Sequence, residues 1–237
     1  MSEVETAWAY LKKDPVLYAN MLEIVRRGSG DILYAGEDGM LLFDRHCGTH
    51  MMSAATSEAA HRLFRLLPEG CELLTGHETF YFIDAVDYLH LGEAQICYSA
   101  LYEGVEPVPM PPVKGDFTFR RVVRDEAAYV LDHYSHSPGG LDFIEGAIER
   151  GMMGAYDGEV LAGFVGFHLE GSIGLLEVLP EYRKRGLGAA LEAAAINLAL
   201  EKGSYAFGQV IEGNAASLAL QRKLGLTISK SRMFWLF

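Results

Sequence analysis

The stretch Leu176–Ala189, LEVLPEYRKRGLGA, decides the fold of the second half of the chain. Its apolar start predicts a β-strand, and Pro180, which has no N–H, predicts that regular strand pairing ends there. A tight turn is expected next, because Gly186 and Gly188 carry no side chain where the backbone must approach another group closely. The helix predicted over 186–202 follows at once, so the segment is a strand, a turn and a helix.

The turn has the composition of an anion-binding site. The first N–H groups of a helix have no intrahelical partner, and they lie at the positive end of the helix dipole. Arg183, Lys184 and Arg185 stand beside them in the sequence. We therefore expect backbone N–H groups and cationic side chains to bind a phosphate-type anion here. A Rossmann dinucleotide site would need a third glycine at position 191, which is Leu191.

A second patterned segment begins at Asn214, which is suited to N-cap a helix. Ser217 and Gln221 follow at steps of three and four, so the three side chains share one helical face. The segment continues as Lys-Leu-Gly-Leu over 223–226, and this glycine predicts the end of the helix.

Together the two segments resemble the coenzyme site of the GNAT N-acyltransferase superfamily. The spacing Arg-x-x-Gly-x-Gly-Ala over 183–189 is similar to the pyrophosphate-binding signature of that family, and Leu-x-Val-x-Pro-x-Tyr over 176–182 is similar to its usual lead-in. Asn214, Ser217 and the Lys-Leu-Gly-Leu that follows resemble the segment that contacts pantetheine. The resemblance extends in order and spacing over residues 117–237.

The resemblance implies acetyl-CoA as co-substrate and no metal. In such enzymes an amine attacks the thioester directly, without a covalent enzyme intermediate, and a base must accept a proton from the amine. Glu177 lies on the strand beside the expected pantetheine and is the first candidate base. Glu170 and His168 on the preceding strand are the alternatives.

The resemblance also implies which residues contact the coenzyme. The backbone N–H groups of Val178 and Leu179 are expected to polarise the thioester carbonyl as it becomes an oxyanion. The full implied set is Val178, Leu179, Arg183, Lys184, Arg185, Gly186, Leu187, Gly188, Ala189, Asn214 and Ser217.

Gln221 departs from the family pattern. Many GNAT enzymes have a tyrosine here that gives a proton to the leaving thiolate, whereas glutamine donates a hydrogen bond but has no proton to give. Gln221 is therefore predicted beside the leaving group, and Tyr182 and Tyr205 are candidates to replace the phenol. Two functions follow: an N-acetyltransferase for a primary amine of a small molecule or amino acid, or a non-catalytic acyl-CoA-binding or sensing protein.

A proline-rich segment divides the chain. Residues 106–116, EPVPMPPVKGD, contain four prolines, which predicts a stiff, extended connector. Residues 117–237 are predicted to be an α/β GNAT domain with a central mixed, mostly antiparallel sheet, and residues 1–105 a smaller α/β half without a coenzyme motif. The resemblance is to bacterial two-part members related to glycine N-acyltransferase, in which the first half is interpreted as a degenerate GNAT-like unit.

The remaining elements follow from hydrophobic periodicity and turn residues. Residues 4–27 predict two helical pieces broken near Asp14-Pro15, and Thr56 is suited to N-cap a helix through Leu67 that buries Leu63, Leu66 and Leu67. Further strands are expected over 31–35, 40–45, 71–74, 94–102, 117–123, 152–156, 159–169, 173–179, 205–211 and 226–237, and further helices over 78–89, 125–135, 141–150 and 214–224.

Composition limits the partners. The 237 residues include 32 acidic and 20 basic ones, a net charge of −12, which argues against non-specific nucleic-acid binding and permits a cationic amine substrate. The most apolar helical stretch, 188–200, is too short for a bilayer, and residues 1–10 have no signal-peptide core, so we expect a cytoplasmic protein without a membrane partner. The sequence leaves open a homodimer.

Cysteine and histidine invite a metal interpretation that their number does not support. His46-Cys47-Gly-Thr-His50 offers three ligand types in a short span, but zinc takes four ligands and no second pair is nearby, so no metal site is predicted. Cys47, Cys71 and Cys97 are widely spaced and odd in number, which predicts reduced, buried thiols.

Overall fold

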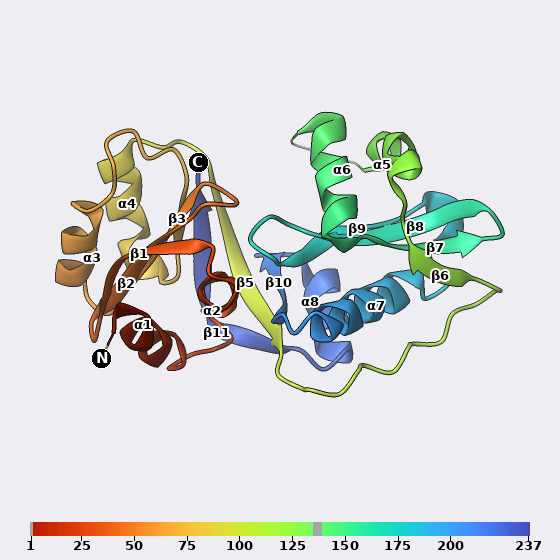
Figure 1. The fold of residues 1–237 in the computed structure, drawn as a ribbon, viewed down its shortest axis with the longest axis horizontal. Helices are drawn as coiled ribbons and strands as arrows, with labels where there is room; N and C mark the ends of the chain where they lie inside the picture. Colours follow the sequence, from red (N-terminus) through yellow and green to blue (C-terminus); the bar gives the residue numbers. More distant parts are fainter. Residues whose placement is uncertain (1, 135–138) are drawn as a thin grey trace. The chain divides into compact units, whose positions relative to one another are not determined.

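A computed structural model describes residues 2–134 and 139–237, which form two compact units of mixed α/β structure (Figure 1). The first unit contains residues 1–101, 209–222 and 226–237, and the second contains residues 102–208 and 223–225. Contacts thus divide the chain differently from the sequence ranges 1–105 and 117–237, which stay predictions. The end of the helix predicted over 125–135 lies outside the described residues.

The first unit is a helix-covered sheet in the order β1-β2-β3-β4-β11-β5. The last strand of the chain, β11, is central here, because it pairs antiparallel with both β4 and β5. The elements are α1 (Glu3–Leu11), α2 (Ala19–Arg27), β1 (Gly30–Gly36), β2 (Gly39–Asp44), β3 (Thr49–Ala54), α3 (Ser57–Phe64), β4 (Leu74–Gly76), the short helix η1 (Thr79–Tyr81), α4 (Phe82–Leu89), β5 (Ala94–Tyr102), α8 (Ala215–Lys223) and β11 (Thr227–Leu236).

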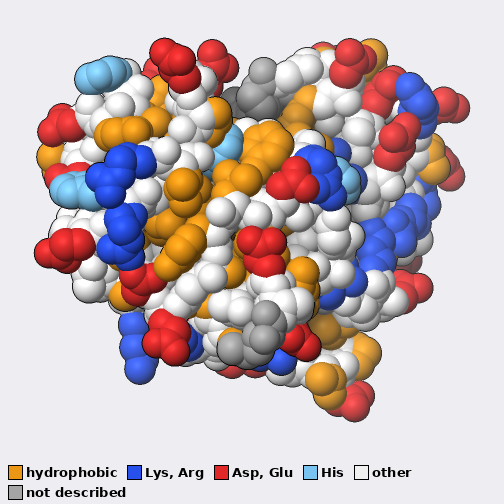
Figure 2. Space-filling model, turned by 60° about the vertical axis from the view of Figure 1, so that its left-hand side comes forward, with side chains coloured by type: hydrophobic (Ala, Val, Ile, Leu, Met, Phe, Trp, Pro, Cys, Tyr) orange, Lys and Arg blue, Asp and Glu red, His pale blue; other side chains and the backbone are white. Residues whose placement is uncertain are grey.

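Local sequence signals set most of these boundaries. The two predicted helical pieces are α1 and α2, and Thr56 caps α3 as predicted, with its side chain accepting the Ala59 N–H at 3.2 Å. The prediction for Leu66 is wrong: α3 ends at Phe64, and Leu66 is 48% exposed. Exposed apolar side chains of this kind lie among charged ones on the face drawn in Figure 2.

Strand β3 is not predicted by the sequence patterns. Its six residues, THMMSA, are all buried, so they show no alternation between apolar and polar positions. Pairing with β2 on one edge and β4 on the other holds them in a strand. Tertiary pairing therefore overrides a weak local preference here.

A buried polar network joins three elements of the first unit. Glu78 accepts hydrogen bonds from the hydroxyls of Tyr18 at 2.9 Å and Ser53 at 2.7 Å, and from the Ala54 N–H at 3.0 Å. Burial raises the pKa of Glu78 despite these donors. Neighbouring His77 is fully buried between the Met52 carbonyl and the Asn20 side chain, and burial lowers the pKa of His77 to about 4.

The second unit contains the antiparallel strand order β9-β8-β7-β6, and β10 pairs in parallel with β9 at Gly208 and Ile173. Figure 1 shows α5 and α6 on one side of these strands and α7 on the other. The elements are β6 (Thr118–Arg121), the short helix η2 (Arg124–Glu126), α5 (Ala127–His133), α6 (Gly140–Gly151), β7 (Met153–Asp157), β8 (Val160–Phe167), β9 (Ile173–Val178), the short helix η3 (Pro180–Tyr182), α7 (Leu187–Glu201) and β10 (Ala206–Ile211).

The proline-rich segment runs extended along α7. The Asn197 side chain bonds both backbone groups of Val108, at 2.7 and 2.9 Å, and the Lys114 N–H donates to the Arg185 carbonyl at 2.8 Å. Asn197 lies on α7, whereas Arg185 lies in the connection just before this helix. The two anchors therefore hold the segment beside the residues that lead into α7.

His77 should make folding stability depend on pH in the acidic range. Its pKa is about 4 in the fold, against an ordinary histidine pKa of 6.5. The unfolded chain therefore binds the proton first as pH falls, and stability is lost between pH 6.5 and pH 4 by about 3 kcal/mol. The raised pKa of Glu78 acts oppositely, because it costs stability as pH rises above the ordinary glutamate pKa of 4.5.

Urea unfolding of the wild type and of His77→Gln, measured from pH 4 to pH 7, isolates the contribution of His77 to the free energy of unfolding. The variant should be less stable at neutral pH, and the gap between the two proteins should narrow towards pH 4. Parallel curves over this range would show that His77 does not titrate as a buried neutral group.

Candidate coenzyme site

The Arg183–Ala189 turn joins β9 to α7 as predicted. β9 ends at Val178, Pro180 starts the short helix η3, and α7 begins at Leu187. Intrahelical bonding in α7 starts with the Ala190 N–H donating to the Gly186 carbonyl at 3.2 Å. The three N–H groups of Leu187, Gly188 and Ala189 therefore precede the helical ladder and lie at the positive end of the helix dipole.

The two glycines of the turn have different roles. Gly186 has a φ of +92°, and a Cβ there would lie 2.6 Å from the Pro112 carbonyl oxygen. A Cβ at Gly188 would meet only the Val178 side chain, at 4.0 Å. Gly186 is thus required by the backbone and its packing, whereas Gly188 leaves space beside the end of β9 that another group can occupy.

Arg183 and Arg185 are held by the turn itself. The Arg183 Nε donates to the Val178 carbonyl at 2.9 Å, and its guanidinium pairs with Glu177 at 3.2 Å. Arg185 donates to the Glu181 carbonyl at 3.2 Å and lies over the Tyr182 ring, 5.3 Å from its centroid. Lys184 is exposed, with a φ of +63°. All three cations therefore belong to the short connection before α7.

Glu177 lies at the end of β9 nearest the turn. Its side chain is 19% exposed, and it stands opposite Phe164 of β8. The alternatives lie at the other end: Glu170 is buried and accepts a hydrogen bond from the Ser172 hydroxyl, and the His168 ring covers Gly174. Five residues of strand separate Ile173 from Val178, roughly 16 Å. Among the three candidate bases, Glu177 alone adjoins the turn.

Tyr134 is a phenol near this site that the sequence did not indicate. It follows α5, and burial together with the charge of Glu177 raises its pKa. Its ring also packs edge-on to Phe164, with 6.2 Å between centroids. No local motif marks Tyr134, because only the packing of α5 on the strands brings it near Glu177.

The two predicted oxyanion donors, the N–H groups of Val178 and Leu179, differ in their hydrogen bonding. The Leu179 N–H donates to the Ala162 carbonyl of β8 at 3.0 Å, so it is engaged within the sheet. Successive residues of a strand direct their N–H groups to opposite edges, so the Val178 N–H faces away from β8. Of the two expected donors, Val178 is the one whose N–H is directed away from β8.

Asn214, Ser217 and Gln221 lie on α8, in the first unit. Asn214 is the predicted N-cap, because its Oδ1 accepts the Ser217 N–H at 3.0 Å. Ser217 is half-buried, and Gln221 is 5% exposed. The predicted coenzyme residues therefore fall into two sets, one in each unit, and their joint contact with a coenzyme stays a prediction.

The two tyrosines proposed to replace the missing phenol differ in setting. Tyr182 packs edge-on to Phe117, with 6.0 Å between ring centroids, and the Arg185 guanidinium lies over the Tyr182 ring. Tyr205 is half-buried, just before β10. Tyr134 is a third phenol to consider, because the charge of Glu177 contributes to its raised pKa.

Within residues 2–134 and 139–237, no group of three or more acidic, histidine or cysteine side chains is arranged to hold a metal ion. The three cysteines are free thiols; Cys71 and Cys97 are buried as predicted, whereas Cys47 is half-buried. Among the described helices, none is long and apolar enough to cross a membrane.

Comparison with known protein families finds a match in the second half of the chain. Residues 119–226 match the acetyltransferase (GNAT) family model. The match supports the assignment of this segment to the GNAT superfamily. No curated protein matches the sequence significantly, and the specific relation to glycine N-acyltransferase stays a prediction.

Solved structures show the same fold along the whole chain. A Drosophila protein has a TM-score of 0.68 at 18% identity, covering 100% of this chain and 96% of that one. A GCN5-related N-acetyltransferase from Kribbella flavida has a TM-score of 0.55 at 13% identity, covering 93% of each chain. A GNAT-family acetyltransferase from Colwellia psychrerythraea has a TM-score of 0.52 at 12% identity, covering 100% of this chain and 97% of that one.

The two glycines of the turn should respond differently to alanine. Gly186→Ala should cost about 1 to 3 kcal/mol, because it places a Cβ on a left-handed backbone and against the Pro112 carbonyl. Gly188→Ala should be neutral or stabilising, since alanine is favoured within helices. Urea unfolding of both variants measures the difference, and equal stabilities would contradict the assigned roles.

Proposed function

We propose that this protein is an acetyl-CoA-dependent N-acetyltransferase that acetylates a primary amine of a small molecule or amino acid. The observation that carries the proposal is the sequence of groups from Glu177 to Gly188: a carboxylate, a strand end whose Val178 N–H is directed away from β8, and a helix start whose first N–H groups precede the helical ladder. Each supplies one requirement of acyl transfer from a thioester. The proposed acceptor is a small molecule in the cytoplasm, and a homodimer is the proposed assembly if the chain self-associates.

The start of α7 would hold the pyrophosphate of the coenzyme. The N–H groups of Leu187, Gly188 and Ala189 supply donors, and the open space at Gly188 lets an anion approach them. The cations of the turn add positive charge next to it. On the edge of β9 away from β8, the Val178 N–H would stabilise the carbonyl oxygen of the thioester in the transition state.

Glu177 would accept the proton of the amine. As the amine nitrogen bonds the acetyl carbon and the carbon–sulfur bond breaks, the nitrogen must lose a proton. Arg183 fixes the Glu177 carboxylate at the end of β9, because it binds the carboxylate and the Val178 carbonyl together. The base is therefore held next to the donor proposed for the thioester oxygen.

The departing thiolate of CoA requires less assistance from the protein than the attacking amine does. A thiol has an ordinary pKa near 8.5, so CoA can leave as the thiolate and take up a proton later. Gln221 can donate an amide hydrogen bond, and Tyr134 is a second candidate donor because its phenol stays protonated at neutral pH. Hydrogen bonding to the departing thiolate therefore does not require a tyrosine on α8.

A non-catalytic acyl-CoA-binding protein is the second candidate. Gln221 in place of the usual family tyrosine favours it. Calorimetric binding of acetyl-CoA, with CoA and ATP as controls, followed by assays of CoA release with a panel of amines, separates the two. Binding with transfer supports the enzyme; binding without transfer to any amine supports the sensor; absence of binding overturns both.

Gly188→Val should abolish acetyl-CoA binding without unfolding the protein, since the branched side chain would occupy the space left for the pyrophosphate. The measurement is the acetyl-CoA-induced rise in melting temperature, with Gly188→Ala as the smaller matched change. A folded Gly188→Val that keeps wild-type affinity would remove the pyrophosphate from this site.

Glu177→Gln should lower kcat by about 10² to 10⁴-fold while the affinity for acetyl-CoA stays unchanged, because the amide cannot accept a proton. Glu170→Gln, at the far end of β9, is the matched control and should retain activity. Loss of activity in the control with full activity in Glu177→Gln would reverse the assignment of the base.

A further inference from the structure

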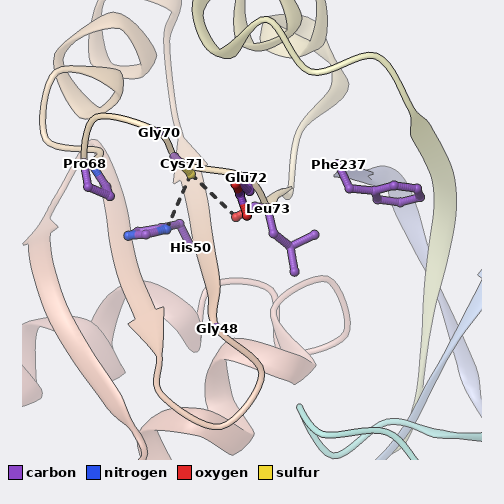
Figure 3. A pocket seen from close by; sticks show the side chains of 8 residues that line it. All are labelled: Gly48, His50, Pro68, Gly70, Cys71, Glu72, Leu73 and Phe237. Atoms are coloured by element: carbon purple, nitrogen blue, oxygen red, sulfur yellow. Dashed lines mark hydrogen bonds between the residues drawn. The ribbon is translucent and has the colours of Figure 1, made fainter. Parts of the chain in front are cut away.

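The first unit contains a cavity that the proposed transfer reaction does not use. Its volume is about 440 Å³, within the range of small-molecule sites. Figure 3 shows Cys71 between the His50 ring and the Leu73 carbonyl. The lining residues are Gly48, His50, Pro68, Gly70, Cys71, Glu72, Leu73 and Phe237.

Local structure fixes Cys71 in this cavity. It ends a four-residue turn from Pro68, whose carbonyl accepts the Cys71 N–H at 3.2 Å, and Gly70 supplies the required positive φ of +76°. This is the pattern of a type II turn, in which glycine occupies the third position. The thiol therefore has a defined direction even though it lies outside a strand or helix.

His50 is fixed by the sheet. It lies on β3, opposite Phe43 of β2 and Leu74 of β4, and its N–H donates to the Leu73 carbonyl at 3.2 Å. The ring packs against Phe43, with 4.8 Å between centroids. His50 is 9% exposed and Cys71 is 6% exposed. Two buried polar side chains thus meet on one cavity wall.

The two side chains are in hydrogen-bond contact. The Cys71 Sγ lies 3.5 Å from the His50 Nδ1 and 3.7 Å from the Leu73 carbonyl oxygen. Burial raises the pKa of the Cys71 thiol and lowers the pKa of His50, so the resting pair is a neutral thiol beside a neutral imidazole. An imidazole in this state can accept the thiol proton.

We propose that Cys71 and His50 form a thiol-exchange site at which Cys71 forms a mixed disulfide with a small neutral or cationic disulfide. The Cys71 sulfur attacks one sulfur of the disulfide as its proton passes to His50. The new sulfur–sulfur bond forms, the old one breaks, and His50 returns the proton to the departing thiolate. The disulfide is itself the oxidant, so the reaction balances without another reagent.

Charge on the cavity wall selects the reagent. Glu72 is a carboxylate in the lining, and the same lining contains no lysine or arginine. A cationic disulfide is therefore favoured over an anionic one by simple electrostatics. Cystamine, a dication, and glutathione disulfide, an anion, are reagents that separate the two cases.

Cys97 and His46 supply internal controls. Cys97 is 2% exposed, and burial raises its pKa to about 12, so it should react only on unfolding. His46 is an exposed histidine just before β3. A Cys47→Ser background removes the half-buried thiol, so that reaction of the folded protein reports on Cys71.

The test measures the rate of mixed-disulfide formation with cystamine by peptide mass mapping in the Cys47→Ser background. Cys71 should react in the folded protein and Cys97 should not. His50→Gln should slow Cys71 at least about tenfold, because the amide cannot accept the proton. His46→Gln should leave the rate unchanged, and glutathione disulfide should react more slowly than cystamine.

Three results would overturn the proposal. They are a Cys71 that reacts only in denaturant, a Cys71 rate equal to that of Cys97 in the folded protein, and an unchanged rate in a folded His50→Gln variant. An equal rate for both disulfides would overturn the selection by Glu72, and Glu72→Gln should abolish any preference that is found. Acetyl transfer is measured in a separate assay, because Cys71 and His50 lie in the first unit whereas Glu177 and Gly188 lie in the second.

Discussion

The left-handed backbone of Gly186, packed on the Pro112 carbonyl, is the constraint on which the coenzyme site depends. It turns the chain from the connection after β9 into α7, and no side chain caps the helix there. The first N–H groups of α7 are therefore left to an external acceptor. The proline-rich segment contributes to this arrangement, because Lys114 bonds Arg185 next to Gly186 while Asn197 holds Val108 further along the helix.

From this point the chemistry follows the strand. Arg183 connects the turn to the end of β9 through the Val178 carbonyl and the Glu177 carboxylate. A single connection thus carries the donors proposed for the pyrophosphate, the donor proposed for the thioester oxygen, and the proposed base. Rigid placement of such groups reduces the reorganisation that the reaction requires. The structure also separates Glu177 from Glu170 and His168 by the length of β9, which the sequence alone left open.

Features that depend on local chemistry could be predicted from the sequence, and those that depend on packing could not. The turn at 183–189, the Thr56 cap and the Asn214 cap follow from glycine, proline and capping residues within a few positions. The strand β3, the position of β11 between β4 and β5, and the exposure of Leu66 depend on distant parts of the chain. Tyr134 near Glu177 and Cys71 against His50 were missed for the same reason. The engagement of the Leu179 N–H by Ala162 likewise became evident only from the ladder between β8 and β9.

Nuclear magnetic resonance of protein labelled with ¹⁵N-glycine tests the central claim most directly, because Gly186 and Gly188 each provide one amide at the start of α7. The spectrum is followed during titration with CoA and, separately, with pantetheine, which lacks the pyrophosphate. The account predicts that the Gly188 amide resonance shifts strongly with CoA and little with pantetheine, as its N–H acquires an anionic acceptor. A Gly188 resonance that stays in place while other glycines respond to CoA would show that the pyrophosphate binds elsewhere.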